Sequence, residues 1–335
     1  MSNAHGVSGH EGSSREILTK ELEPYTNEIR IDKLGNLIAT KFGEGPSVML
    51  SAHTDEVGLS INYITDDGFL HFIGIGGWFD QTLLNQRVKV HGTQGDLLGV
   101  IGSKPVHLLE EEERKKPIKI KDMFVDIGAR DADDVRNLGV KIGTPVTIDR
   151  EFMPLANDLV TGKALDDRAG CVMMIEGMRR TKTKATVYAV GSIQEEVGSK
   201  GARTASFGLT PDVAIATETD VAGDYPGIEK KEAHLKLGKG PSVTVVDTDL
   251  ITPEKVLQWI EETARKYDIP YQPDVGTAGS TDAAIINLTR EGIPSGVVSV
   301  VTRYLHTPVE VLNLKDLDNA ATLIARMLET VGEYF

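Results

Sequence analysis

The chain reads Ser47-Val48-Met49-Leu50-Ser51-Ala52 and then His53-Thr54-Asp55-Glu56. A short apolar run bounded by polar residues is typical of a buried strand. Directly after this run come the imidazole of His53 and the carboxylates of Asp55 and Glu56. In open α/β sheets, sites are built in the loops at the carboxyl ends of strands. Residues 47–56 therefore predict a strand with functional side chains at its end.

Further along the chain, apolar strand-like runs alternate with helical segments. That alternation predicts an α/β sandwich, and the strand ending at His53 is expected to belong to its sheet. Beyond a hairpin over residues 27–41, we expect strands over 185–190, 213–216 and 296–300, and helices over 13–22, 169–180, 253–267 and 314–334.

The stretch from about residue 61 to 150 has a different sequence pattern. It carries many short β-type runs, such as Arg87–His91 and Pro145–Ile148, with glycine and aspartate turns between them. Even spacing of short strands is typical of a small barrel or sandwich. We therefore expect residues 62–150 to form an inserted β-rich domain, with 1–61 and 151–335 forming one discontinuous domain around it. Residues 108–121 are highly charged and are expected to be an exposed helix or loop.

Charge and composition narrow the class of protein. The 335 residues carry 36 basic and 50 acidic side chains, a net charge of −14, which argues against binding to nucleic acid or an anionic membrane. Cys171 is the single cysteine, so an internal disulfide and a thiolate cluster are both excluded. No membrane-length apolar run and no signal-like leader are visible, so the expected location is the cytoplasm.

Five segments place imidazole or carboxylate groups at or just after a predicted strand end. Imidazole together with carboxylate is the ligand set expected for Zn²⁺, Co²⁺ or Mn²⁺. Each segment alone also has a plain structural explanation, such as a capped histidine, a solvated Glu-Glu pair or an aspartate N-cap. Their joint occurrence indicates a metal site. The segments are His53-Thr54-Asp55, Asp166-Asp167, Glu195-Glu196, Glu218-Thr219-Asp220 and Leu305-His306-Thr307.

Neighbouring carboxylates can divide the work of such a site. Asp55 lies two residues past His53 and on the same side of an extended strand, so it can fix the imidazole tautomer. The side chains of Glu195 and Glu196 diverge, so one can bind metal while the other acts as a general base. Asp166-Asp167 can supply a carboxylate that bridges two metals.

The chain resembles the tetrahedral, or deblocking, aminopeptidase family of dinuclear metallopeptidases. This family includes glutamyl aminopeptidases and was formerly labelled endoglucanase-like. The likeness spans essentially the whole chain. Its matching motifs are Gly6–Glu11, Asp32–Leu37, Ala52–Gly58, Asp126–Ala129, Lys163–Gly170, Gln194–Gly198, Gly201-Ala202, Gly223-Asp224, Pro226-Gly227, Gly276–Ala283 and Arg303–Glu310.

The resemblance implies a role for each matching site residue. Two divalent ions, Zn²⁺ or Co²⁺, would be shared by five ligands, with Asp166 bridging and Glu195 as general base. Asp220 is a rival to Glu218, because the family often carries aspartate at that ligand position. By the family pattern the ligands are His53, Asp166 and Glu218 for one ion and Asp166, Glu196 and His306 for the other, with Asp55 behind the first histidine and Asp282 lining the site.

The fold and activity that the resemblance implies are equally specific. The fold is a three-layer α/β/α sandwich of the zinc-exopeptidase type with an inserted small, PDZ-like β-barrel. The activity is two-metal hydrolysis of N-terminal residues from short peptides. The inserted block implies dimers that assemble into a tetrahedral dodecamer. Alternatives are an N-acyl amino acid amidohydrolase on the same site, a metal-free glycanase, which leaves both histidines unused, and a non-catalytic peptide-binding assembly protein.

Overall fold

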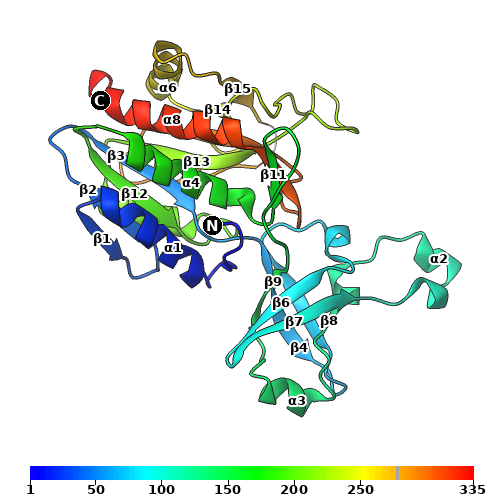
Figure 1. Cartoon of the computed structure of the whole chain (residues 1–335). Helices are drawn as coiled ribbons and strands as arrows, with labels where there is room; N and C mark the ends of the chain where they lie inside the picture. The colour runs from blue at the N-terminus through cyan, green and yellow to red at the C-terminus, as the bar shows by residue number, and fades with distance from the viewer. Residues whose placement is uncertain (277–278) are drawn as a thin grey trace.

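A computed structural model describes residues 1–276 and 279–335. Thr277 and Ala278, which belong to the Gly276–Ala283 motif, lie outside the described residues. The chain forms an open sheet covered by helices, with a separate small barrel beside it (Figure 1).

Strand β3 (Ser47–His53) lies inside the large sheet. It pairs in parallel with β12 (Thr186–Ser192) on one side and β13 (Val213–Val221) on the other, and β13 pairs in parallel with β16 (Ser295–Arg303). The main strand order is β1-β2-β12-β3-β13-β16-β17-β11-β10, and β14 and β15 extend from β16. The remaining strands are β1 (Glu28–Ile31), β2 (Leu37–Lys41), β10 (Met153–Pro154), β11 (Leu159–Gly162), β14 (Ser242–Val246), β15 (Gln272–Val275) and β17 (Glu310–Asn313).

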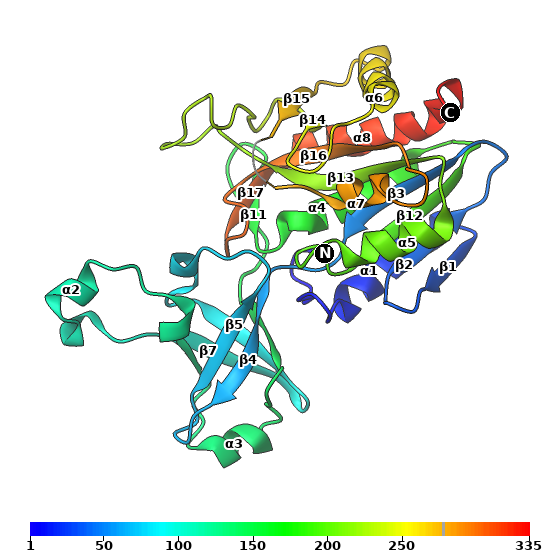
Figure 2. The same ribbon diagram turned by 180° about the vertical axis from the view of Figure 1, so that it is seen from behind.

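Helices cover both faces of this sheet. Successive residues of a strand point to opposite faces, and β3 follows this rule: Val48 and Leu50 join one apolar cluster, while Met49 joins another. The larger cluster packs under four helices and the smaller under two, which Figure 2 shows from the other side. The predicted three-layer α/β/α sandwich is therefore confirmed. The helices are α1 (Gly12–Leu22), α4 (Leu165–Arg180), α6 (Glu254–Lys266) and α8 (Leu314–Thr330) on one face, and α5 (Lys200–Leu209) and α7 (Asp282–Asn287) on the other.

Helices α4 and α8 pack closely in the larger cluster. The side chain of Asn313 begins α8 by accepting hydrogen bonds from the backbone N–H groups of Lys315 and Asp316. A Cβ at Gly177 of α4 would lie 2.7 Å from the Ile324 side chain of α8. Glycine at this position therefore lets the two helices approach.

The predicted inserted barrel is present and closed. Its strand order is β4-β5-β8-β7-β6-β9, and it has its own apolar core, which includes Leu59, Leu70, Val88 and Val125. The chain leaves the large sheet after β3, forms the barrel and returns at β10. The barrel strands are β4 (Gly58–Ile64), β5 (Leu70–Ile75), β6 (Arg87–Gly92), β7 (Gly95–Gly102), β8 (Phe124–Asp126) and β9 (Pro145–Ile148), accompanied by helix α3 (Ala132–Asn137).

Some elements differ in length from the sequence prediction. Strand β13 continues to Val221, because its parallel pairing with β16 extends through residues that are no longer apolar. The span of helix α4 begins at Leu165, four residues before the predicted start, but it is kinked at Asp166 and Asp167, whose backbone angles are not helical. The charged segment 108–121 contains the short helix α2 (Glu111–Arg114) and 3₁₀ turns. In the described part of the chain, no helix combines the length and apolar character needed to cross a membrane.

Candidate metal centre

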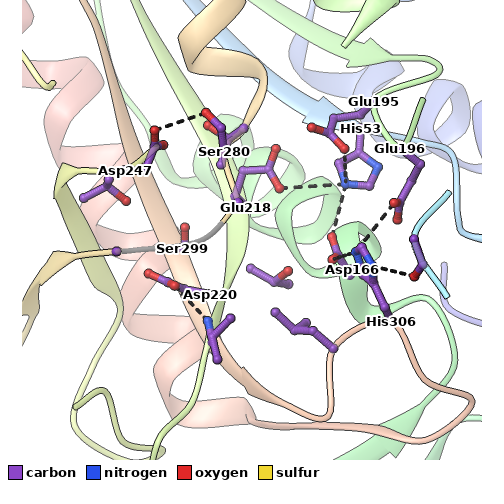
Figure 3. Close-up of a pocket in the computed structure, with 18 of the residues that line it drawn as sticks. His53, Asp166, Glu195, Glu196, Glu218, Asp220, Asp247, Ser280, Ser299 and His306 are labelled. Carbon is purple, nitrogen blue, oxygen red and sulfur yellow. Dashed lines mark hydrogen bonds and ion pairs between the residues drawn. The ribbon is translucent and has the colours of Figure 1, made fainter. Parts of the chain in front are cut away.

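The candidate site residues lie together at the carboxyl edge of the central parallel strands (Figure 3). His53 ends β3, and Glu218 projects from β13. The Glu195-Glu196 pair follows β12, and His306 follows β16. Asp166 comes from the first turn of α4. Elements far apart in the sequence therefore converge on one place.

The carboxylate of Asp166 lies between two imidazoles. Its Oδ1 is 3.1 Å from Nε2 of His53, and its Oδ2 is 3.4 Å from Nε2 of His306. Glu196 Oε2 is 3.5 Å from the same His306 nitrogen. Two ligand atoms that each lie about 2.0–2.2 Å from one tetrahedral ion are separated by about 3.4 Å. These spacings therefore suit two cations that share Asp166.

Two more carboxylates face the His53 ring. Glu218 Oε2 is 3.8 Å and Glu195 Oε2 is 3.9 Å from His53 Nε2. Asp220 is engaged elsewhere, since its Oδ2 accepts a 2.7 Å hydrogen bond from the Ser242 hydroxyl. The structure thus brings Glu218, rather than Asp220, to the imidazole.

The cluster holds more negative than positive groups in a buried place. Burial raises the pKa of Glu195 to about 8 and that of Glu196 to about 7, and it raises the pKa of Glu218 well above its ordinary value. Among the described residues, Oε1 of Glu196 and Oε1 of Glu218 are buried without a hydrogen-bond partner. Buried, unpaired carboxylates are costly unless a cation joins them. This donor set therefore fits divalent cations.

Asp55 lies directly behind His53. Its Oδ1 is 3.4 Å from His53 Nδ1, the ring nitrogen that faces away from Asp166. The same carboxylate accepts hydrogen bonds from the backbone N–H groups of Glu195 (3.0 Å) and Glu196 (3.2 Å). One buried side chain thus orients both the imidazole and the Glu-Glu loop.

Asp282 links two strands of the sheet near their carboxyl ends. Its Oδ2 accepts hydrogen bonds from the hydroxyls of Ser51 (2.8 Å) and Ser192, which lie on adjacent strands. It is fully buried, and its Oδ1 has no hydrogen-bond partner among the described residues. Asp282 therefore joins β3 to β12, and no hydrogen bond or ion pair among the described residues connects it to an imidazole.

Two positioning residues were not assigned from the sequence. Asp167 accepts a 3.1 Å hydrogen bond from the backbone N–H of His53. Glu310, the first residue of β17, accepts 3.1 Å hydrogen bonds from the backbone N–H groups of Asp166 and His306. The Arg303–Glu310 motif contained this glutamate, but nothing in its spacing indicated these contacts.

The inserted barrel also reaches this site. The carbonyl oxygen of Gly77, just beyond β5, accepts a 2.8 Å hydrogen bond from Nδ1 of His306. That contact leaves Nε2 of His306 unprotonated when the ring is neutral, so the nitrogen facing Asp166 and Glu196 has a lone pair.

A cavity of about 530 Å³ opens beside the cluster. It is also lined by Asp220, Asp247 and Asp274, and Figure 3 shows Asp247 across the cavity from the imidazoles. Among the described residues, no lysine or arginine lines it. The cavity is therefore strongly acidic throughout.

Comparison with known proteins agrees with this arrangement. Residues 35–323 match the model of the M42 glutamyl aminopeptidase family. The chain is 37% identical over 329 residues to the lysyl aminopeptidase of Pyrococcus furiosus, covering 97% of this chain and 93% of that protein.

Solved structures of aminopeptidases are also similar to this chain. An aminopeptidase from the archaeon Desulfurococcus kamchatkensis has a TM-score of 0.94 and 39% identity over 98% of this chain and 92% of that one. The TET1 peptidase of Pyrococcus horikoshii, described as assembling into a tetrahedron or a large octahedral shell, has a TM-score of 0.89 and 33% identity over 98% of this chain and 96% of that one. This chain therefore belongs to the M42 glutamyl aminopeptidase family and is a metal-dependent aminopeptidase.

Proposed function

We propose that this aminopeptidase uses two divalent cations, zinc or cobalt, to remove residues from the N-terminus of short peptides, with Glu195 as general base. The observation that carries the proposal is the position of Asp166, whose two oxygens face two different imidazoles. His53 and Glu218 would complete one cation position, and Glu196 and His306 the other. Cations bound there would activate water and polarise the scissile carbonyl.

Glu195 has the surroundings that a general base needs. Its Oε2 faces His53 at 3.9 Å, and its Oε1 accepts a 3.2 Å hydrogen bond from the Ser199 hydroxyl. Burial raises its pKa to about 8, which makes the ionised carboxylate a stronger base toward the attacking water than an exposed glutamate. The same carboxyl group then gives that proton to the leaving amine. The surplus of carboxylates around the cavity also favours a chain end, because a free α-amino group finds acceptors there.

A Glu195→Gln variant tests the base directly. It should bind the same number of Co²⁺ ions as the wild type and lose about 10²–10⁴-fold in kcat, the usual contribution of a positioned base. Glu44→Gln, an exposed substitution, serves as the control and should keep full activity. Near-normal turnover by Glu195→Gln would exclude the base, and cleavage of N-acetylated peptides as fast as free ones would exclude an aminopeptidase mechanism. Chelation should abolish activity, and added Co²⁺ or Zn²⁺ should restore it.

The acidic cavity supports a preference for an N-terminal lysine or arginine. Asp274 is buried, and its Oδ1 lies 3.7 Å from Nδ1 of His234, while no lysine or arginine among the described residues pairs with it. Two like charges about 5 Å apart repel by about 3 kcal/mol at an effective dielectric constant of about 20, so a glutamyl side chain is disfavoured there. The lysyl aminopeptidase relative supports the same preference.

A panel of aminoacyl-anilides measures this preference. We expect kcat/KM to be about 100-fold higher for lysyl than for glutamyl substrates, the factor that about 3 kcal/mol implies. Asp274→Asn should narrow the gap without lowering turnover of a leucyl substrate. Equal rates for lysyl and glutamyl substrates would refute the charge argument while leaving the hydrolytic mechanism intact.

The barrel supports self-association. Its strands β4, β5 and β7 leave the large apolar side chains of Tyr63, Ile73, Leu98 and Val100 about half exposed or more. Apolar side chains gathered on one module are typical of an interface. We propose dimers through this barrel that assemble into a tetrahedral dodecamer, whose hollow form would admit only short or unfolded peptides. Native mass spectrometry of the wild type and of Leu98→Lys tests it, and a wild-type monomer under all metal conditions would refute it.

A further inference from the structure

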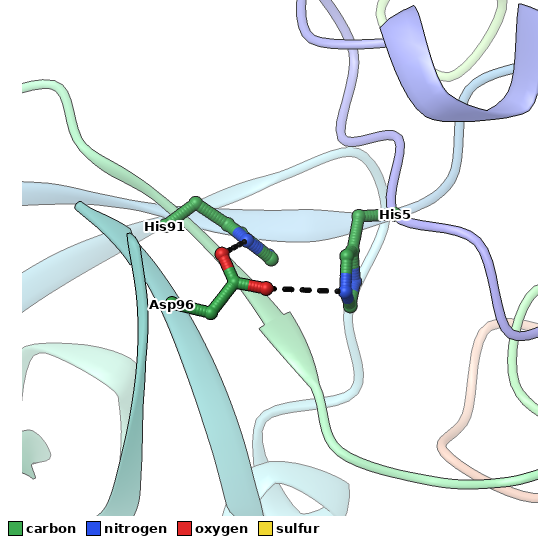
Figure 4. Close-up of side chains that lie close together, drawn as sticks. All are labelled: His5, His91 and Asp96. Atoms are coloured by element: carbon green, nitrogen blue, oxygen red, sulfur yellow. Dashed lines mark hydrogen bonds and ion pairs between the residues drawn. The ribbon is translucent and has the colours of Figure 1, made fainter. Parts of the chain in front are cut away.

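A second group of potential ligands lies where the N-terminal segment meets the barrel. His5 comes from the segment that leads into the large sheet, His91 from β6 and Asp96 from β7 (Figure 4). None of the three lines the catalytic cavity. They border a separate open hollow of about 480 Å³, which His10 also lines.

The three side chains face one another at short range. Asp96 Oδ1 is 2.7 Å from His91 Nδ1, and Asp96 Oδ2 is 3.6 Å from His5 Nε2. The two rings lie 4.3 Å apart between centroids, with their planes tilted by 53°. The first distance is that of a hydrogen bond. The second is too long for one, but it matches the separation of about 3.4 Å expected for two ligands on one ion.

The contacts of Thr147 determine which nitrogen of each imidazole carries the proton. Thr147 is fully buried, and its hydroxyl lies 3.1 Å from His5 Nδ1 and 2.9 Å from His91 Nε2. A neutral His91 carries its proton on Nδ1, because a bare nitrogen 2.7 Å from the Asp96 carboxylate would repel it. His91 Nε2 is then bare and accepts the single hydroxyl proton of Thr147.

The remaining contact leaves one nitrogen free. Since the Thr147 proton is used on His91, its oxygen accepts a hydrogen bond from the Nδ1–H of His5. A neutral His5 then has a lone pair on Nε2. That lone pair faces a carboxylate oxygen, an arrangement that a cation between the two atoms would stabilise. His5 is one-quarter and Asp96 about half exposed, so an ion and its waters can enter.

We propose that His5 Nε2 and Asp96 Oδ2 bind one divalent cation of the zinc, cobalt or nickel class, outside the catalytic centre. His91 is a positioning residue that holds the Asp96 carboxylate through its other oxygen. Water fills the remaining coordination positions. The ion would clamp the N-terminal segment to the barrel. The clamp adjoins the main-chain contact of Gly6 with Glu56, where the carbonyl of Gly6 accepts a 2.9 Å hydrogen bond from the Glu56 N–H.

Counting bound ions separates this site from the catalytic one. Full-length protein is dialysed against Co²⁺, and bound cobalt per chain is measured by mass spectrometry. The wild type should bind one more ion per chain than His5→Ala or Asp96→Asn. His91→Ala should lower the affinity for that extra ion by about 10–100-fold. His10→Ala, from the same hollow, is the matched control and should bind as the wild type does.

A second measurement keeps the test independent of folding. His5→Gln can still donate to Thr147 through its amide, and it should fold and hydrolyse peptides normally while lacking the extra ion. The melting temperature of the wild type should rise with Co²⁺ beyond the concentration that saturates activity, and that of His5→Gln should not. Equal cobalt counts and affinities in the wild type, His5→Gln and Asp96→Asn would overturn the proposal.

Discussion

The carboxylate of Glu310 holds the backbone N–H of His306 through a 3.1 Å hydrogen bond, and its other oxygen holds the N–H of Asp166 at the same distance. One side chain on β17 thus fixes two site residues that come from different segments. Both contacts are to the main chain. Glu310 therefore fixes the backbone position of the two proposed ligands and leaves their side chains free to bind.

Replacing Glu310 by glutamine should therefore weaken the site without removing any ligand. A glutamine can keep one accepting oxygen, but its amide NH₂ then faces a second N–H. We expect a loss of about 1–3 kcal/mol in unfolding free energy, the cost of an unsatisfied buried donor. Co²⁺ affinity, measured by equilibrium dialysis, should fall with it. The exposed control Glu44→Gln should change neither quantity, and unchanged Co²⁺ affinity in Glu310→Gln would remove Glu310 from the site's support.

Asp55→Asn should disturb both the His53 imidazole and the loop that carries Glu195 and Glu196. The carboxylate orients the His53 ring and accepts from the N–H groups of Glu195 and Glu196. Loss of such an outer partner typically costs 10–100-fold in metal affinity or activity, and we expect a loss of about that size here. Ser8→Ala removes a single 2.6 Å hydrogen bond to Asp55 and should cost less. If Ser8→Ala proved as damaging as Asp55→Asn, the imidazole contact would not be the cause.

Stability should depend on pH through Asp224 and Arg303. Burial alone would raise the pKa of Asp224, but two 2.7 Å hydrogen bonds from Arg303 and its charge hold that pKa below its ordinary value. A carboxyl whose pKa is lowered by folding contributes stability above its unfolded pKa and loses it as pH falls. The contribution should be full above about pH 4–5 and decline in more acidic solution.

Unfolding free energies of the wild type and Asp224→Asn measure this contribution. The wild type should be more stable by about 1.5–3 kcal/mol at pH 7, in line with hydrogen bonds to charged groups. The difference should shrink between about pH 4 and pH 3. Asp67→Asn, an exposed substitution, should show no such trend. A gap between the wild type and Asp224→Asn that stayed constant into acid would contradict the assignment.

Gly170 of α4 tests how tightly the site is packed beneath Asp166. A Cβ there would lie 2.0 Å from the carbonyl oxygen of Thr217 and 2.2 Å from Oδ1 of Asp167. Gly170→Ala should therefore destabilise by several kcal/mol, since overpacking forces the backbone to shift. Gly12→Ala, in open space at the start of α1, is the matched control and should be neutral or slightly stabilising. Thermal unfolding of the two variants gives the comparison.

The sequence predicted the fold from local signals. Apolar runs such as residues 47–52 predicted buried strands, and their alternation with helical stretches predicted an α/β sandwich. The three-layer form, which is confirmed, was implied by the family resemblance. The limits of β13 were wrong because pairing with β16 continues through polar residues. Periodicity detects burial, whereas pairing of neighbouring strands decides where a strand stops.

Site assignment met a similar limit. Glu218 and Asp220 lie two residues apart on β13, so both point to the same face, and only their positions along the strand separate them. The roles of Glu310 and Asp167 depend on main-chain hydrogen bonds that tertiary structure creates. His5, His91 and Asp96 follow no common spacing rule. Such juxtapositions become visible only when the segments are placed in space.

The hydrogen bond between His306 and Gly77 bears on attempts to shorten this enzyme. The inserted barrel, which looks detachable, supplies the acceptor that orients the imidazole of a proposed metal ligand. A truncated form without the insertion would lose more than the proposed assembly surface, because the His306 ring could then rotate and present the wrong nitrogen. Charged substitutions at the exposed apolar side chains of the barrel are therefore a better route to a single-subunit form than deletion of the barrel.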